Sequence, residues 1–104
     1  LYVDDLADAI VHLMKLDNPP DWVNVGTGQD VTILELAQQI AATVGFSGII
    51  TTDPSKPDGT PRKVCDVSLL NSLGWRAQTP LSVGLKRTLD CFLSETTTGS
   101  RRSV

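Results

Sequence analysis

The stretch WVNVGTG at residues 22–28 decides the fold that we expect for this chain. Residues 22–25 are typical of a short β-strand that stops at a turn containing two glycines. A helix is expected next, because Thr32 and Glu35 have the spacing of a capping box and apolar residues then recur with helical period. The β-branched run at residues 49–52 predicts a second strand. This order favours two parallel strands with a right-handed crossover.

Apolar residues with helical period predict further helices on both sides of that unit. They are expected from residue 3 to the turn at 18–21, from Ser68 to Leu73, and from Pro80 onward. The expected fold class is therefore α/β, with about four helices and a minimal two-stranded parallel sheet. Residues 1–95 are predicted to fold, and residues 96–104, which have no apolar period, are predicted to be a disordered tail.

Composition and charge exclude several classes of protein. The chain has 104 residues, of which 40% are apolar and 20% charged, as in an ordinary folded domain. No apolar run approaches the roughly 20 residues of a membrane-spanning helix, and no leader peptide is recognisable, so we expect a cytoplasmic protein without membrane contact. A net charge of −3 and few aromatic residues argue against nucleic-acid binding.

The polar loop SKPDGTPRK at residues 55–63 carries the candidate binding residues. Its two prolines limit its freedom, so we expect a shaped loop rather than a flexible linker. It also holds three of the cations that gather in the second half of the chain, whereas the charged residues among the first 50 are mostly acidic. A shaped cationic loop is a natural place to hold a phosphate group.

The two cysteines, Cys65 and Cys91, share no metal-ligand spacing with each other or with His12, so no metal site is predicted. We interpret both as buried thiols, and a disulfide between them stays an open alternative.

Six other residues are given structural roles. Asp4 and Asp5 are expected to cap the first helix, and His12 to form a surface pair with Asp8, four residues earlier. Trp22 and Trp75 are expected to pack in the core or at its edge.

Four segments together resemble one family of enzymes. They are LYVDDLADA at 1–9, VNVGTG at 23–28, the polar loop at 55–63 and LGW at 73–75. In this combination they are similar to GDP-L-fucose synthases, which are extended short-chain dehydrogenases/reductases, and the loop is the most specific of the four. The resemblance covers residues 1 to about 93. It implies that the chain is the C-terminal, substrate-binding region of such an enzyme and holds no complete Rossmann fold.

The family's reaction is also implied by the resemblance. The complete enzyme would convert GDP-4-keto-6-deoxymannose into GDP-L-fucose, by epimerisation at two carbons followed by reduction with NADPH. The family's glycine-rich cofactor loop and its acid, base and tyrosine–lysine residues lie in an N-terminal Rossmann domain that this sequence does not include. We therefore expect no catalytic residue and no bound cofactor in this chain, with NADP implied only for the full-length enzyme.

What the resemblance leaves to this chain is binding of the GDP-sugar, with weak affinity expected in isolation. The family's lysine at the end of the polar loop lies at the GDP-sugar, and that role falls on Lys63, whose compact charge suits a diphosphate. Arg62 is a second substrate-binding candidate, although alternation of side chains can point it elsewhere. Asp58, Gly59 and Thr60 are expected to shape the loop, Asp58 and Thr60 through local hydrogen bonds.

Two other interpretations stay open. The chain could be a stand-alone, non-catalytic α/β module that forms a homodimer through the apolar surface normally covered by the Rossmann domain. It could also be the equivalent region of another nucleotide-sugar epimerase, although the polar loop argues against this.

Overall fold

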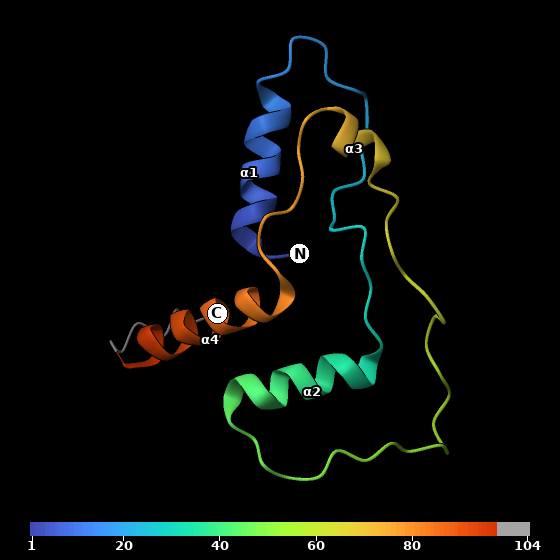
Figure 1. Ribbon diagram of the computed structural model, residues 1–104, viewed down its shortest axis with the longest axis vertical. Helices are drawn as coiled ribbons and strands as arrows, with labels where there is room; N and C mark the ends of the chain where they lie inside the picture. Colours follow the sequence, from blue (N-terminus) through green and yellow to red (C-terminus); the bar gives the residue numbers. More distant parts are fainter. Residues whose placement is uncertain (98–104) are drawn as a thin grey trace.

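The computed structural model of the chain describes residues 1–97, and these residues form four helices joined by long irregular segments (Figure 1). The helices are α1 (Val3–Met14), α2 (Ile33–Val44), α3 (Ser68–Ser72) and α4 (Leu81–Thr97). The prediction of four helices is thus confirmed. Figure 1 shows α3 and the segment after it beside α1, whereas α2 and α4 lie at the other end of the molecule and contact each other. No helix of the described chain is long and apolar enough to cross a membrane.

The predicted two-stranded sheet, and with it the α/β class, is wrong for residues 1–97, which contain no strand. Residues 49–52 are exposed throughout and lie on the outer loop that runs below α2 in Figure 1. The other predicted strand, residues 22–25, ends beside a different segment. A Cβ built on Gly26 would lie 3.6 Å from the Cβ of Cys65. A β-branched run indicates an extended chain but not its partner, and two short strands alone are marginal.

The local signals that bound α2 are confirmed atom by atom. The Glu35 amide donates to Thr32 Oγ1 at 3.1 Å, and the Thr32 amide donates to Glu35 Oε2 at 2.8 Å. Gly45 ends the helix in the left-handed conformation with φ of 75°. Both ends of α2 are therefore set by residues within or next to the helix itself.

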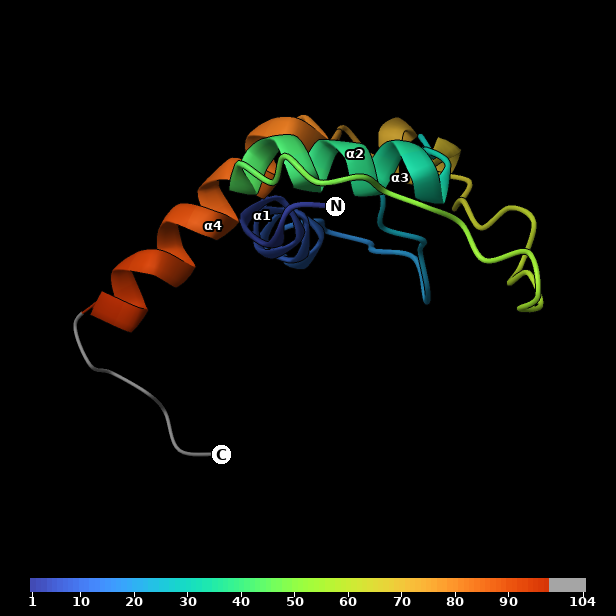
Figure 2. The ribbon, with the colours of Figure 1, turned by 90° about the horizontal axis from the view of Figure 1, so that it is seen from below.

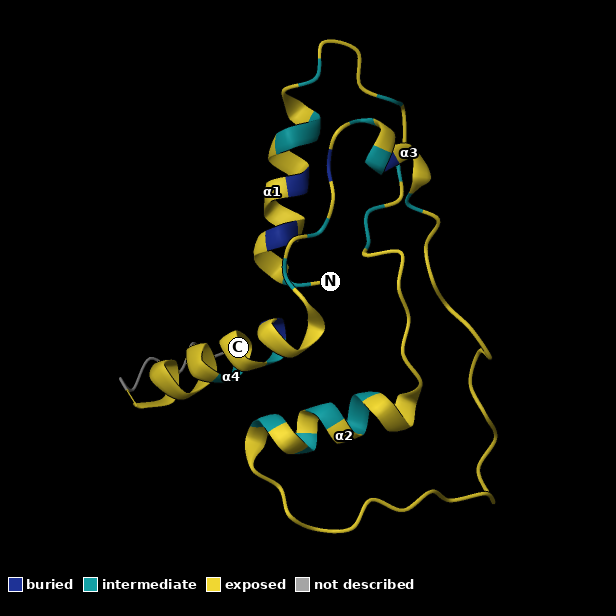
Figure 3. Ribbon diagram, viewed as in Figure 1, coloured by how far each residue is buried: buried dark blue, intermediate teal, exposed yellow. Residues whose placement is uncertain are grey.

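The core of the molecule is small and sits between α1, α3 and the segment that follows α3 (Figure 3). Its buried apolar members are Ala9, Leu70 and Trp75. Partly buried apolar residues surround them, namely Leu13, Val23, Val25, Val67 and Ala77. The core role predicted for Trp75 is confirmed, whereas the same prediction is wrong for Trp22, which is 77% exposed.

A polar stripe along α1 joins this helix to residues 73–79. His12 Nε2 donates to the carbonyl oxygen of Leu73 at 2.7 Å, and Trp75 Nε1 donates to Asp8 Oδ2 at 2.8 Å. The predicted His12–Asp8 surface pair is therefore wrong, because each side chain has a partner more than 60 positions away. Periodicity alone could not show this, since it identifies the face of a helix but not what covers it.

Much apolar surface is left uncovered elsewhere. Helix α2 has no buried residue, and Figure 3 shows buried positions mainly around α1 and α3. The apolar residues of α1 that face away from the core are exposed, namely Leu6, Ile10, Val11 and Met14. The total accessible surface is 8690 Å², well above the roughly 5,700 Å² that a compact monomer of this mass exposes. The shallow, spread arrangement is visible in Figure 2.

The structure changes the boundary predicted for the C-terminal tail. Helix α4 continues to Thr97, so the tail boundary predicted at residue 96 falls inside a helix, and residues 98–104 lie outside the described part of the chain.

Cys65 and Cys91 are both free and exposed, so their interpretation as buried thiols is wrong. Neither the segment around Cys65 nor the outer part of α4 is covered by another element.

Candidate functional site

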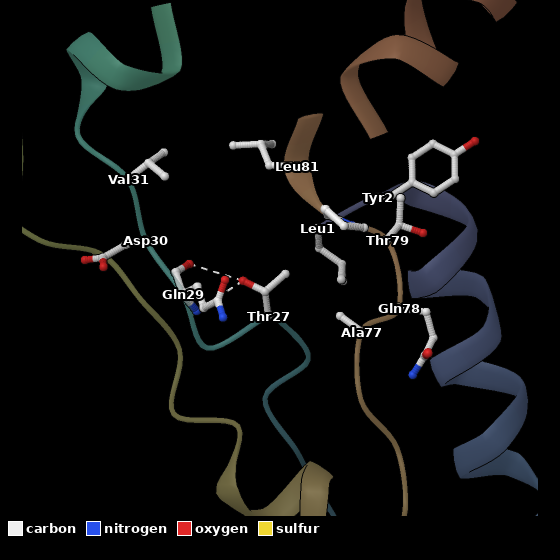
Figure 4. Close-up of a pocket in the computed structure, with 11 residues that line it drawn as sticks. Leu1, Tyr2, Thr27, Gln29, Asp30, Val31, Ala77, Gln78, Thr79 and Leu81 are labelled. Carbon is white, nitrogen blue, oxygen red and sulfur yellow. Dashed lines mark hydrogen bonds between the residues drawn. The ribbon is translucent and has the colours of Figure 1, made fainter. Parts of the chain in front are cut away.

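Three segments far apart in sequence enclose the pocket shown in Figure 4. Its walls come from residues 1–2 before α1, residues 27–31 before α2, and residues 77–81, which lead into α4. The cavity volume is about 390 Å³. Figure 4 shows Thr27 and Gln29 on one side, opposite Ala77, Gln78 and Thr79. The mixture of hydroxyl, amide and apolar groups is suited to a polar ligand of modest size.

Asp5 fixes the wall formed by residues 77–81. Its carboxylate is 8% exposed and accepts hydrogen bonds from the amides of Gln78 at 3.0 Å and Thr79 at 2.8 Å. The Thr79 hydroxyl adds a third at 3.0 Å. These bonds, led by that from the Thr79 amide, hold the pKa of Asp5 below its ordinary value. The expectation that Asp5 caps α1 is wrong, because its carboxylate accepts hydrogen bonds from the backbone amides of the segment that leads into α4.

Tyr2 joins the first wall of the pocket to α4. Its ring lies against Gly84, where an added Cβ would come within 3.3 Å of the Tyr2 Cβ. The Arg87 guanidinium lies 5.7 Å from the ring centroid, within the range of a cation–π contact. Loss of solvation, with a smaller effect of Asp4, raises the pKa of the Tyr2 phenol above its ordinary value. The phenol is therefore neutral at physiological pH and acts here as a packing group.

The second wall depends on a tight turn at residues 27–29. The Thr27 hydroxyl oxygen accepts from the Gln29 amide at 3.2 Å, and Gly28 has φ of +73°. A Cβ at Gly28 would lie 2.8 Å from Val67 Cγ2, so the glycine also permits close approach of the segment that carries Val67. Gly28 is therefore accounted for by backbone shape, whereas at Gly26 φ is not positive and an added Cβ would make only ordinary contacts.

The polar loop at residues 55–63 is exposed along its whole length. A turn at Asp53 shapes its start: Asp53 Oδ1 accepts from the Ser55 hydroxyl at 2.6 Å and from the Ser55 amide at 3.0 Å. The Ser55 hydroxyl, and then its amide, lower the pKa of Asp53. This turn precedes the residues that we expected to shape the loop.

The three predicted loop-shaping residues behave differently from expectation. Within the described chain, Asp58 and Thr60 form no hydrogen bond that stabilises the loop. Gly59 does not have a positive φ, and a Cβ added there would meet nothing within 4 Å. The loop is held by Asp53 at its start and by Arg62 near its end instead.

Arg62 is tied to Asp30, which stands 32 positions earlier. Its Nε donates to Asp30 Oδ2 at 2.6 Å and its Nη2 to Asp30 Oδ1 at 3.4 Å. The bond from Arg62 lowers the pKa of Asp30, and the same contact raises the pKa of Arg62. Asp30 also lines the pocket, so this pair joins the polar loop to the pocket wall. In Figure 4 the Asp30 carboxylate points out of the pocket.

Lys63 follows directly, and its side chain is exposed. Within residues 1–97 it takes part in no ion pair, and it is not among the residues that line the pocket. The structure therefore brings Arg62 to the pocket wall and leaves Lys63 on the open surface beside it.

Sequence reasoning did not find the roles of the two acids that organise this region. Asp30 and Asp5 bind groups 32 and more than 70 positions away, and nothing local marks them as partners. The described residues contain no cluster of three or more side chains that could hold a metal ion.

No family model matches the sequence, but individual proteins do. The chain is 50% identical to GDP-L-fucose synthase 1 of Arabidopsis thaliana over 93 residues, covering 89% of this chain and 29% of that protein. It is 48% identical to the GDP-L-fucose synthase of Escherichia coli K12, covering 89% of this chain and 32% of that protein.

The fold of the chain also resembles part of a solved structure. The described fold resembles part of a GDP-6-OMe-4-keto-L-xylo-heptose reductase from C. jejuni, with a TM-score of 0.77 and 31% identity over 88% of this chain and 29% of that one. The chain spans about 30% of the length of the curated relatives that it matches. The resemblance to GDP-L-fucose synthases predicted from the sequence is thus confirmed along most of the chain.

Proposed function

We propose that this chain is the GDP-sugar-binding portion of a GDP-L-fucose synthase-like epimerase/reductase. The observation that carries the proposal is identity of about half to two GDP-L-fucose synthases, with a GDP-sugar reductase as structural neighbour. The reaction proposed for the complete protein is conversion of GDP-4-keto-6-deoxymannose to GDP-L-fucose with NADPH. The cofactor and the catalytic groups belong, in this proposal, to a Rossmann domain outside the sequence studied, so the isolated chain is inactive.

Lys63 is the proposed contact to the diphosphate. It is exposed, and it stands just after a residue that is tied to the pocket wall. An ammonium group on a flexible stem can approach either phosphate of a diphosphate as a point charge. The hydroxyl and amide groups of the nearby pocket are suited to neutral parts of the same ligand.

The proposal is tested by titrating GDP into the chain and into Lys63→Ala by calorimetry. A lost charge-assisted hydrogen bond of roughly 1.5–3 kcal/mol corresponds to a decrease in affinity of about 10- to 100-fold. Lys56→Ala is the matched control, because it removes the same charge from the same loop. If the two variants weaken GDP binding equally, the loop acts through its overall charge and not through a contact specific to Lys63. Unchanged GDP affinity in Lys63→Ala would contradict the assignment.

Self-association is the second candidate function, and the exposed apolar surface favours it. The chain exposes far more surface than a compact monomer, and the excess is larger than the roughly 800 Å² that each partner buries in a standard interface. A homodimer of the isolated chain could cover the outer face of α1, which in the full-length protein is proposed to meet the Rossmann domain. Sedimentation velocity at several concentrations tests this, and a monomer throughout the micromolar range would contradict it.

A further inference from the structure

The ion pair between Arg62 and Asp30 is one of two fixed points next to Lys63. Arg62 meets Asp30 through two nitrogens, at 2.6 and 3.4 Å. Two residues after Lys63, the side chain of Cys65 lies near Gly26, where an added Cβ would be 3.6 Å from the Cys65 Cβ. Lys63 thus lies between an ion pair on one side and a segment close to Gly26 on the other.

The two neighbouring cations differ in their partners. Residues 62–67 have no helical or turn structure. Within residues 1–97, Lys63 takes part in no ion pair, so its charge is not neutralised by Asp30 or by another carboxylate. The Arg62 charge, by contrast, already has an anionic partner within the molecule.

Both side chains of the ion pair are exposed. We therefore expect the pair to fix the position of the polar loop rather than to add to the overall stability of the fold. The side chains are 70% and 38% exposed, for Arg62 and Asp30 respectively. Exposed ion pairs contribute little to global stability, so variants at these positions are expected to fold. Their effect is expected in the placement of a loop that is otherwise bonded only at its Asp53 turn.

From this arrangement we infer that Arg62 is a positioning residue, held by Asp30, that aims Lys63 at the diphosphate of the GDP-sugar. The inference rests on the proposed function for its ligand. It assigns Asp30 a role in binding although Asp30 carries the same charge sign as the ligand.

The sign of the Asp30→Asn effect on GDP affinity separates a positioning role from a ligand role. If Arg62 positions Lys63, both Asp30→Asn and Arg62→Gln weaken GDP binding, each by about three- to fivefold, and the double variant is no weaker than the singles. If Arg62 itself binds phosphate, Asp30→Asn releases a cation and GDP binds as well or better, while Arg62→Gln alone is weaker. That second pattern overturns the inference.

Exchange of the two charges provides a rescue test. The double variant Asp30→Arg with Arg62→Asp keeps the net charge and restores an ion pair of reversed polarity. We expect it to regain most of the GDP affinity that either single reversal loses. A double variant as weak as the weaker single reversal argues against a tether between the two positions.

A readout without GDP distinguishes failure of this inference from failure of the proposed function. Limited trypsin digestion cleaves after Lys63, and cleavage after Lys15 at the end of α1 serves as the internal reference. We expect Asp30→Asn and Arg62→Gln to accelerate cleavage after Lys63 severalfold relative to the reference. If the unchanged chain binds no GDP, the proposed function fails, while the digestion still decides whether the tether exists. Equal cleavage rates in all variants would refute the tether.

Discussion

The molecule has two regions of opposite construction. The packed corner, made of α1, α3 and residues 73–79, holds Ala9, Leu70 and Trp75 and three long-range side-chain anchors from α1. The open edge, made of α2 and residues 45–63, has well-formed helix ends but no buried residue. Local signals can therefore form a helix without giving it a place in a core. The corner supplies the stability, and the open edge is where a ligand or partner has surface to bind.

The largest effect is expected from Leu70→Ala in the packed corner. Leu70 is fully buried, so the variant loses about 2–5 kcal/mol of unfolding free energy. Ile49→Ala on the open edge is the matched control, because that side chain is 88% exposed and its loss changes stability by less than about 0.5 kcal/mol. Urea denaturation followed by circular dichroism measures both. A large loss in Ile49→Ala would show that the open edge is covered in solution.

A pair of glycine variants sharpens the comparison at the backbone. Gly28→Ala places a side chain at φ of +73° and against Val67, so we expect a loss of about 1–2 kcal/mol. Gly59→Ala meets open space at a φ that is not positive, and restricting the unfolded chain there gives a gain of about 0.4–1 kcal/mol. Thermal unfolding of both variants tests this. Destabilisation by Gly59→Ala would restore the loop-shaping role predicted for Gly59.

A smaller effect is expected from loss of the hydrogen bond between Trp75 and Asp8, which Asp8→Ala removes without changing a core residue. The bond measures 2.8 Å and its acceptor is on the surface, so about 1 kcal/mol is at stake. In a double-mutant cycle, Asp8→Ala should add almost nothing to Trp75→Phe. Fully additive losses would mean that the two side chains act independently.

The smallest effect is a change in the pH dependence of stability, and it comes from Asp5. Hydrogen bonds to its carboxylate lower its pKa in the folded state, so the folded state favours the ionised form. The resulting stability is complete above the ordinary pKa of about 4 and is lost as the pH falls through the lower, folded-state value. We expect Asp5→Asn to show a flatter decline of thermal stability below pH 4 than the unchanged chain. Parallel curves for the two proteins would count against this role.

The sequence was a good guide wherever a structure depends on neighbouring residues. The Thr32–Glu35 capping box and the closing Gly45 were predictable, because both partners lie within a few positions of each other. The sheet was not predictable, because pairing depends on which distant segment lies alongside. Residues 23–28 lie beside Cys65 and Val67 and not beside 49–52.

In the candidate site, too, the features set by neighbouring residues could be predicted and those set by distant residues could not. The polar loop could be singled out from its cations and prolines, and the resemblance pointed to Lys63. The loop's anchors could not be found this way, because Asp30 is separated from Arg62 by 32 positions and has no distinctive neighbours. The burial of Cys65 and Cys91 was overestimated for a similar reason, since their surroundings depend on elements that do not cover them here.

The long-range anchors of α1 have a consequence for the order in which the chain can fold. His12 and Asp5 find their partners 61 and more than 70 residues later, so α1 cannot be fixed until residues 73–79 have been synthesised. A 12-residue helix is marginal in water by itself, and closing a loop of this length is slow. While the residues between α1 and that segment are being synthesised, the nascent chain therefore carries α1 as an amphipathic helix that has not yet been fixed.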